Sequence, residues 1–441
     1  MAGIGRQVDS EGLLDRISNL PDHLIDRILG KLPLSAVVRT SILSKRWKDC
    51  WKRLRKIEPD MCFFNEFIQM DSAIYAILVL HNGPLDEFIL IVPFSARACH
   101  FGDASKWLML LSKKYIKDLT LCGFSENRIT IPSHIFSCLG LKSLHLIACD
   151  IKPLDSFGGF KDLTSLTLDD VIIPDALLQI LISNSPLLEA LKLAYLASGD
   201  PVLVDGPKLR KLMFISETRP LLLKYSPSCT EVQIESELIV PLNRSGQSKL
   251  NEFVCLLPKV EKLNLAGVSL NSLGVGFARV QFPSTLHHLK HLELTFFDSS
   301  STTHISSAFY LIQSAPNLES LGILIHWTYF REENEAAACM LKAQERACNL
   351  SRLRKVEFKN LHVSENELLL VKAALRCFPM LETVTVNGGL YLSKEEEVCV
   401  VERLLELQVP GSPVFKFRYI GNEPAGHLFN CQEDNMYSRA N

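Results

Sequence analysis

The sequence predicts an α/β protein in which three short helices precede an irregular solenoid, a curved parallel sheet with helical returns. Apolar residues recur at helical spacing in three short stretches between residues 17 and 55. An apolar triplet of the form L-x-x-L-x-L then recurs along most of the remaining chain, and six of these triplets have a proline two residues ahead. Each unit of such an array covers its apolar face only with neighbouring units, so the 441 residues can form one elongated body.

Composition excludes several classes of protein. The formal charge of −2 lacks the positive field that holds a protein on phosphate backbones, which argues against nucleic acid as a partner. The 13 cysteines are scattered without a C-x-x-C pair, so we expect no zinc site and interpret them as small reduced core residues. No apolar signal or membrane-spanning stretch stands out, and we expect a soluble cytoplasmic or nuclear protein.

The helical pattern of the first stretch has clear boundaries. Pro21 occupies a favoured position at a helix start, an apolar stripe follows at helical spacing, and Pro33 ends the helix. Ser35 is the expected N-cap of a second helix, and Ser44 that of a third. A unit of about forty residues has too small a core to be stable alone. Its remaining apolar surface therefore has to pack on the rest of the chain or on a partner.

The letters LPDHLIDRILGKLP at residues 20–33 and VVRTSILSKRW at residues 37–47 resemble an F-box of the flowering-plant type. The resemblance covers the whole motif and implies docking on a Skp-type adaptor and, through it, on a cullin. Packing on the repeat body is the alternative for the same residues. The implied adaptor contacts are Leu20, Pro21, Leu24, Ile28, Leu29, Leu32, Pro33, Val37, Val38, Leu43 and Trp47.

A basic run covers residues 45–56. It could be a nuclear signal or a phosphate-binding patch. Because apolar residues keep a helical period within it, we favour a solvated helix face on which the cations fill the outer side.

The apolar triplets recur twelve times, and the distance between successive central residues ranges from 20 to 35. These spacings straddle the 20 to 29 residues of leucine-rich repeats, in which each unit supplies one short parallel strand and a return. The preceding prolines end each return before the strand begins. The central residues are Phe88, Leu119, Leu144, Leu166, Leu191, Leu212, Val232, Leu263, Leu292, Leu321, Val356 and Val384.

Residues that flank the inner apolar positions are expected on the open face of the sheet, where they can hold a protein substrate. Lys192, Lys211, Glu231 and Glu293 are candidates of this kind, although such residues can equally belong to a solvated face. A lengthened repeat adds Trp327, Tyr329 and Phe330, since aromatic residues in insertions are favoured anchors. Burial within the longer repeat is the other interpretation of these aromatics.

The segment 350–421 contains the fragments LRKVEF at 353–358, ENELLLVK at 365–372 and PMLE at 379–382. With these fragments it resembles the FBD domain that accompanies F-boxes in plants. We therefore divide the chain into an F-box at 14–56, repeats at 57–349, an FBD segment at 350–421 that continues the solenoid, and a disordered tail at 422–441.

The sequence contains no catalytic motif that we can identify, and we expect no cofactor and no metal. The resemblance implies a non-catalytic, substrate-recognising subunit of a Skp-Cullin-F-box ubiquitin ligase, acting on an unknown protein. A scaffold without degradative role and a small-molecule co-receptor of the hormone-sensing kind remain alternatives. Scarce arginine on the expected open face argues against the co-receptor, because an anionic ligand favours forked donors.

Overall fold

The structure is a computed structural model. It describes residues 20–60, 70–92, 104–126, 128–153, 157–241, 249–274, 286–326, 334–344, 352–362, 364–388, 394–407 and 413–418. The chain divides into two compact units, unit 1 up to Arg219 and unit 2 from Pro220 onward.

Unit 1 begins with helices and continues as a parallel sheet. The strands follow the order β1-β2-β3-β5-β6-β7-β9, and β4 pairs with β5 outside this path. Its helical elements are α1 (Asp22–Leu29), α2 (Leu34–Arg39), η1 (Thr40–Ile42), η2 (Trp47–Arg53), α4 (Met70–Leu80), α5 (Ser105–Ser112), η4 (Ser133–Ser137) and α6 (Asp175–Ser183). Its strands are β1 (Lys56–Ile57), β2 (Glu87–Ile91), β3 (Asp118–Cys122), β4 (Ile129–Ile131), β5 (Ser143–Ile151), β6 (Ser165–Ile172), β7 (Ala190–Ala194), β8 (Val202–Val204) and β9 (Lys211–Ser216).

Unit 2 also consists of parallel strands and helices. Its strands follow the order β11-β13-β14-β15-β16-β17-β18, while β10 pairs with β12. The strands are β10 (Leu221–Leu223), β11 (Glu231–Ser236), β12 (Ile239–Pro241), β13 (Lys262–Ala266), β14 (His291–Phe297), β15 (Ser320–Ile325), β16 (Lys355–Leu361), β17 (Thr383–Gly388) and β18 (Val414–Arg418). The helices are α7 (Lys249–Leu256), α8 (Gly267–Gly274), α9 (Thr302–Ser314), α10 (Glu335–Gln344), α11 (Glu365–Cys377) and α12 (Lys394–Leu405).

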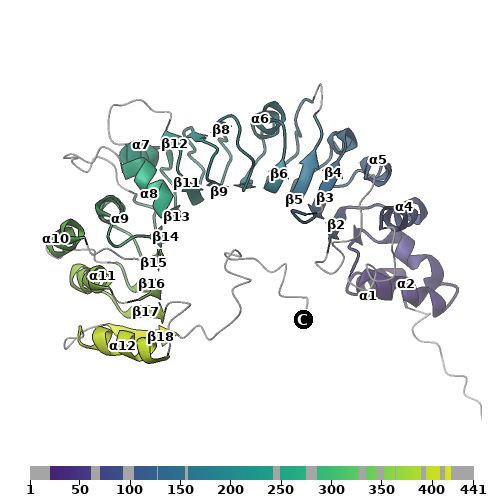
Figure 1. Ribbon diagram of the computed structural model, residues 1–441. Helices are drawn as coiled ribbons and strands as arrows, with labels where there is room; N and C mark the ends of the chain where they lie inside the picture. The colour runs from purple at the N-terminus through teal and green to yellow at the C-terminus, as the bar shows by residue number, and fades with distance from the viewer. Residues whose placement is uncertain are drawn as a thin grey trace, which may run out of the picture. The chain divides into compact units, whose positions relative to one another are not determined.

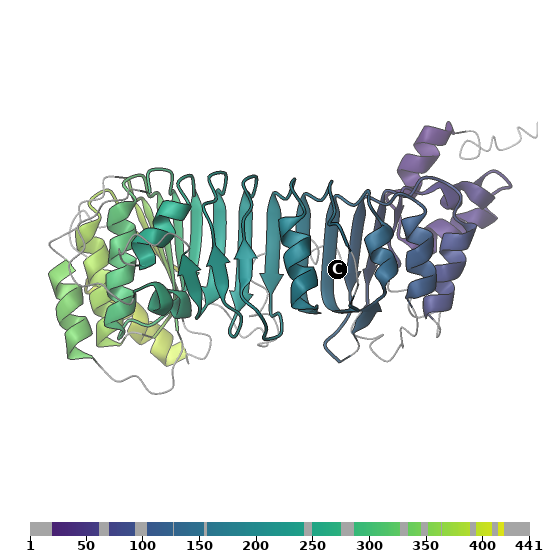
Figure 2. The same ribbon diagram turned by 90° about the horizontal axis from the view of Figure 1, so that it is seen from above.

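Within each unit the helices cover one face of the sheet. Figure 1 shows α5 and α6 on one side of the unit 1 strands, and Figure 2 views these helices in front of the strands. The core lies between the two layers: Leu144 and Leu146 of β5 are 1% and 0% exposed, whereas Ser143 and His145 are only half-buried. This alternation is the period of two that a sheet with one covered face requires.

The predicted α/β architecture, with N-terminal helices before a parallel sheet, is confirmed. Each of the twelve predicted central residues lies on a strand, and the strands pair in parallel along the sheet of each unit. The expected disordered tail and several loops lie outside the described residues. The described residues contain no helix that is both long enough and apolar enough to cross a bilayer.

Three local predictions were wrong. Ser35 does not cap the second helix, because α2 starts at Leu34 and the Ser35 hydroxyl donates to Asp60 Oδ2 at 2.8 Å. The third helix, η2, is a 3-10 helix, and the buried Ser44 hydroxyl has no hydrogen-bond partner among the described residues. The cysteines are not uniformly buried either. Cys255, Cys339 and Cys399 are exposed at the surface.

Candidate functional site

The N-terminal helices enclose a small core of their own. Ile25 and Leu29 lie one helical turn apart on α1 and are 0% and 1% exposed. They pack with residues of α2 and η2, and Ile77 of α4 packs against the same cluster. The remaining members of the cluster are Val37, Trp47, Cys50 and Trp51. The apolar side of each amphipathic element thus forms the core that holds these helices together.

The other side of the same elements leaves large apolar side chains in solvent. We call this set the N-terminal apolar face. It comprises Ile28, Leu32, Val38, Ile42 and Leu43, which are 41%, 39%, 39%, 86% and 57% exposed. Single exposed apolar residues are ordinary, but several from consecutive short elements are typical of a surface that a partner covers.

Polar contacts fix the helices that carry this face. Arg46 Nη2 donates to Asp22 Oδ1 at 2.6 Å and so ties the start of α1 to the segment before η2. The hydrogen bond from Arg46, together with its charge, lowers the pKa of Asp22. Asp60 accepts from both the backbone N–H and the hydroxyl of Ser35 at the start of α2. These bonds therefore fix α1 to the segment before η2, and the start of α2 to the segment around Asp60.

The N-terminal helices are also attached firmly to the first repeat. His81 Nε2 lies 2.7 Å from the carbonyl oxygen of Leu54, and the N–H groups of Asn82 and Gly83 both donate to Lys52 O. A Cβ on Gly83 would lie only 2.8 Å from the Cα of Arg53, so glycine permits this close approach. Strand β1 pairs directly with β2, which makes the end of the helical segment the edge of the repeat sheet.

The structure separates the predicted adaptor contacts into surface and core residues. Leu20 and Leu24 are half-buried. Leu29, Val37 and Trp47 are 1%, 0% and 2% exposed, so their predicted role as direct contacts needs correction. They lie beneath the N-terminal apolar face and support it, because the small core of these helices requires them. The predicted contacts that are exposed are Pro21, Ile28, Leu32, Pro33, Val38 and Leu43.

The basic run is largely neutralised by neighbouring carboxylates. Lys52 Nζ lies 2.6 Å from Asp49 Oδ1, Arg55 Nε lies 3.2 Å from Asp86 Oδ2, and Lys56 Nζ lies 2.8 Å from Glu58 Oε2. These ion pairs favour the interpretation as a solvated surface rather than as a phosphate-binding patch.

The predicted substrate contacts are divided between the two units and the residues outside the description. Lys192 pairs with Asp169 at 3.0 Å and Lys211 is exposed at the start of β9, both in unit 1. In unit 2, Glu231 pairs with Lys262 at 3.2 Å and Glu293 with Lys359 at 2.9 Å. Trp327, Tyr329 and Phe330 lie outside the described residues.

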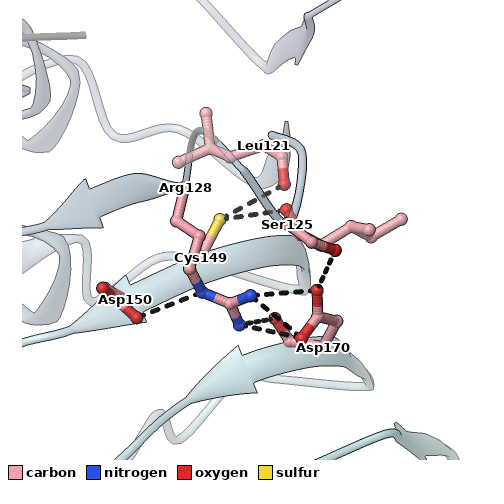
Figure 3. Close-up of polar contacts among 7 residues, drawn as sticks. Leu121, Ser125, Arg128, Cys149, Asp150 and Asp170 are labelled. Atoms are coloured by element: carbon pink, nitrogen blue, oxygen red, sulfur yellow. Dashed lines mark hydrogen bonds and ion pairs between the residues drawn. The ribbon is translucent and has the colours of Figure 1, made fainter. Parts of the chain in front are cut away.

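A polar cluster at the ends of β5 and β6 was not foreseen from the sequence. Arg128 Nη1 lies 2.9 Å from both carboxylate oxygens of Asp170, and Arg128 Nε lies 3.3 Å from Asp150 Oδ1, as Figure 3 shows. Ser125 Oγ donates to Asp170 Oδ2 at 2.7 Å. The Arg128 side chain is 17% exposed and its donors already have acceptors, so the cluster acts as a clamp between strand ends.

One cavity of about 350 Å³ lies in unit 1, where the helical return α6 is followed by the extended return β8. Its wall is mainly apolar and includes Ile182, Leu188, Val204 and Leu209, with Asp205 and Lys208 among the polar residues. Within the described part of the chain, no group of His, Cys, Asp or Glu side chains is arranged to hold a metal ion.

Comparison with known proteins agrees with these features. An F-box domain model matches residues 17–58, and a model described as FBD-associated F-box protein At5g56370, LRR repeats, matches residues 104–299. The F-box/FBD/LRR-repeat protein At1g13570 of Arabidopsis thaliana is 28% identical over 403 residues, which cover 89% of this chain and 95% of that protein.

The chain is thus similar to the plant F-box/FBD/LRR-repeat proteins, with an F-box match followed by an LRR match. A second relative, the FBD-associated F-box protein At5g38590 of the same plant, is 27% identical over 71% of this chain and 78% of its own length. The F-box match coincides with the N-terminal helices, and the LRR match covers repeats of both units. The segment from β16 to β18 continues the parallel sheet of unit 2. The FBD boundary at residue 350 stays a prediction.

Proposed function

We propose that this chain is the substrate-recognition subunit of a Skp-Cullin-F-box ubiquitin ligase, acting in the cytoplasm or the nucleus. The F-box docks on a Skp-type adaptor through the N-terminal apolar face, and the repeats with the FBD segment hold a target protein. The observation that carries the proposal is the exposure of Ile28, Leu32, Val38 and Leu43 on an F-box whose own core is already complete.

The mechanism requires no chemistry from this chain. Holding the target near a conjugating enzyme raises the effective concentration of its lysines, which is an intramolecular advantage rather than a catalytic one. Such a tether has to be stiff enough to keep the target in place. The contacts of His81, Asn82 and Gly83 with the end of the F-box supply this stiffness between the docking helices and the first repeat.

Co-purification with a Skp-type adaptor and a cullin tests the proposal. We expect Ile28→Asp combined with Leu43→Asp to weaken adaptor binding at least about thirtyfold, since a charge would be buried in an apolar contact. Ile172→Asp is the matched control, because Ile172 is 49% exposed at the end of β6 and lies outside the F-box. If a folded chain with both substitutions still binds the adaptor, the proposal is contradicted.

The scaffold alternative differs in its consequence for the bound protein. A ligase subunit shortens the half-life of its target when the F-box is intact, whereas a scaffold leaves that half-life unchanged. The co-receptor alternative is favoured by one observation, the cavity beside α6, whose size suits a small ligand. It would require that the target binds only after a small molecule is added.

A further inference from the structure

Phe296, near the end of β14 in unit 2, has a backbone conformation that bulky residues rarely adopt. Its φ is +51°, and its side chain is 42% exposed. The register with β15 shifts between Leu294 and Phe297, and an irregularity of this kind re-aims a side chain. Phe297 faces α9, which Figure 1 shows on one side of the unit 2 strands, because its ring centroid lies 5.6 Å from that of His304. By contrast, the ring of Phe296 is exposed.

Other strands also have a positive φ at the equivalent position, two residues after the second inner apolar residue. Ala148, Asp170 and Asn360 occupy this position in β5, β6 and β16. Asn and Asp tolerate the left-handed conformation better than other residues with a side chain. An exposed phenylalanine gains neither this tolerance nor full burial. Local structure therefore does not account for Phe296, and a strained residue of this kind points to a binding role.

Contacts inside unit 2 fix the backbone on both sides of Phe296. A Cβ on Gly267 would overlap the carbonyl oxygen of Phe296, so glycine permits this close approach. The N–H of Asp298 donates to His304 Nδ1 at 3.0 Å. The ring of His326 meets that of Phe296 edge-on, with 6.3 Å between the ring centroids. An exposed aromatic ring on a fixed backbone is a favoured anchor for a partner.

Two exposed carboxylates lie at the same end of the sheet. Asp298 follows Phe296 by two residues, and its Oδ1 accepts from the N–H of Ser300 at 2.8 Å. Asn334 Nδ2 donates to the carbonyl oxygen of Ser300 at 3.0 Å, which brings Glu335, the first residue of α10, to this strand end. Neither Asp298 nor Glu335 has a cationic partner among the residues that the structure describes.

The lysines of the unit 2 sheet do not offset these carboxylates. Lys359 lies 2.9 Å from Glu293 and 3.8 Å from Glu357, so one lysine serves two further carboxylates. Strand geometry places the other described lysines of this sheet at least about 13 Å from the end of β14, at the strand starts or four strands away. They are Lys262, Lys355 and Lys416. The end of β14 therefore carries an excess of negative charge.

We propose that the end of β14 binds an arginine side chain of the target protein, with Phe296 as the anchor. This inference rests on the proposed function and specifies the class of target segment. A guanidinium stacks on an aromatic face and also donates paired hydrogen bonds to a carboxylate, and Phe296 with Asp298 offers both. A lysine is less suitable, because its ammonium is a compact and strongly hydrated charge.

Selection from a phage-displayed library of random dodecapeptides, on the full chain, tests the inference. We expect enriched peptides to contain arginine. Phe296→Asn should weaken the binding of an enriched peptide at least about tenfold. The thermal midpoint should stay the same or rise, because Asn adopts the left-handed conformation more readily. Asp298→Asn should weaken binding at least about threefold, since Asn can still accept from the N–H of Ser300 but lacks the charge.

Tyr195→Asn is the matched control. Tyr195 follows β7 in unit 1, has a φ of +51° and is 46% exposed, so the same substitution is made at the same repeat position of the other unit. It should leave the peptide affinity within about twofold. A peptide in which citrulline replaces arginine keeps the planar shape without the charge, and should bind the unaltered chain at least about tenfold more weakly.

Every other outcome contradicts the inference or the proposed function. Enriched peptides without arginine, no enrichment, or equal losses in Tyr195→Asn and Phe296→Asn would overturn the inference. So would peptide binding that Phe296→Asn leaves unchanged in a folded chain. Adaptor binding is measured separately by co-purification, and its absence with intact arginine selection would instead contradict the F-box part of the proposed function.

Discussion

His304 is a titratable residue inside unit 2 rather than at its surface. It is 5% exposed, and its Nδ1 accepts a hydrogen bond of 3.0 Å from the backbone N–H of Asp298. An accepting Nδ1 requires the unprotonated form of that nitrogen. Burial lowers the pKa of His304, and the attraction of Asp298 offsets this only in part.

This environment makes stability depend on pH. In the unfolded chain the His304 pKa returns to about 6.5, so below that pH the unfolded state binds a proton that the native state does not. We expect the free energy of unfolding to fall as pH decreases from about 7 toward the lower native pKa. His304→Asn should flatten this dependence, as denaturant midpoints at pH 7.5 and pH 5.5 would measure. An equal pH dependence in both proteins would contradict this role of His304.

Two neighbouring residues of α1 show what the sequence pattern cannot predict. Ile28 is 41% exposed and Leu29 is 1% exposed, yet both belong to the same apolar stripe of the sequence. Helical spacing predicts that the stripe is apolar, but a small helical unit packs on both sides, inward on its own core and outward on a partner. The division between Ile28 and Leu29 therefore depends on tertiary packing that the spacing does not contain.

At the scale of elements, a buried arginine joins successive returns of unit 1. The Arg219 side chain is 3% exposed; its Nη1 lies 2.6 Å from Asp175 Oδ1, and its Nε and Nη2 donate to the carbonyl of Ala197. A Cβ on Gly199 would lie 2.4 Å from Arg219 Nη2, so this glycine makes room for the guanidinium. Arg128 performs the same task at the ends of β5 and β6.

Removal of the Arg219 clamp should destabilise unit 1. We expect Arg219→Ala to lower the free energy of unfolding by about 2 to 3 kcal/mol, because Asp175 and the Ala197 carbonyl lose their donors. Gly199→Ala should also destabilise, because it displaces the guanidinium. Urea denaturation measures both effects, with the exposed Arg352→Ala as control. A loss below about 0.5 kcal/mol for Arg219→Ala would show that the clamp contributes nothing beyond an ordinary surface contact.

The main strands could be predicted because each carries an apolar triplet, and Pro186 or Pro207 ends the return before it. The sequence did not indicate β1, β4, β8, β10, β12 or the Arg clamps. These strands have two or three residues, too few for a period, and Arg128 meets Asp170 across 42 residues. Contacts of that separation arise from stacking the repeats, which a local pattern cannot encode.

At the scale of the whole molecule, the proposed function assigns adaptor docking to the F-box and target binding to the repeats with the FBD segment. Stability of a repeat array comes mainly from neighbouring repeats, so substitutions of exposed residues can change binding without unfolding the chain. This separation makes the two binding roles testable one at a time.

The most direct test of the central claim is hydroxyl-radical footprinting of the full chain with and without a Skp-type adaptor. We predict that labelling of Ile28, Leu32, Val38 and Leu43 falls to the level of buried Leu29 when the adaptor binds. Labelling of the exposed Ile172 should not change. Unchanged labelling of the N-terminal apolar face, under conditions in which the complex forms, would contradict the docking role of the F-box in this chain.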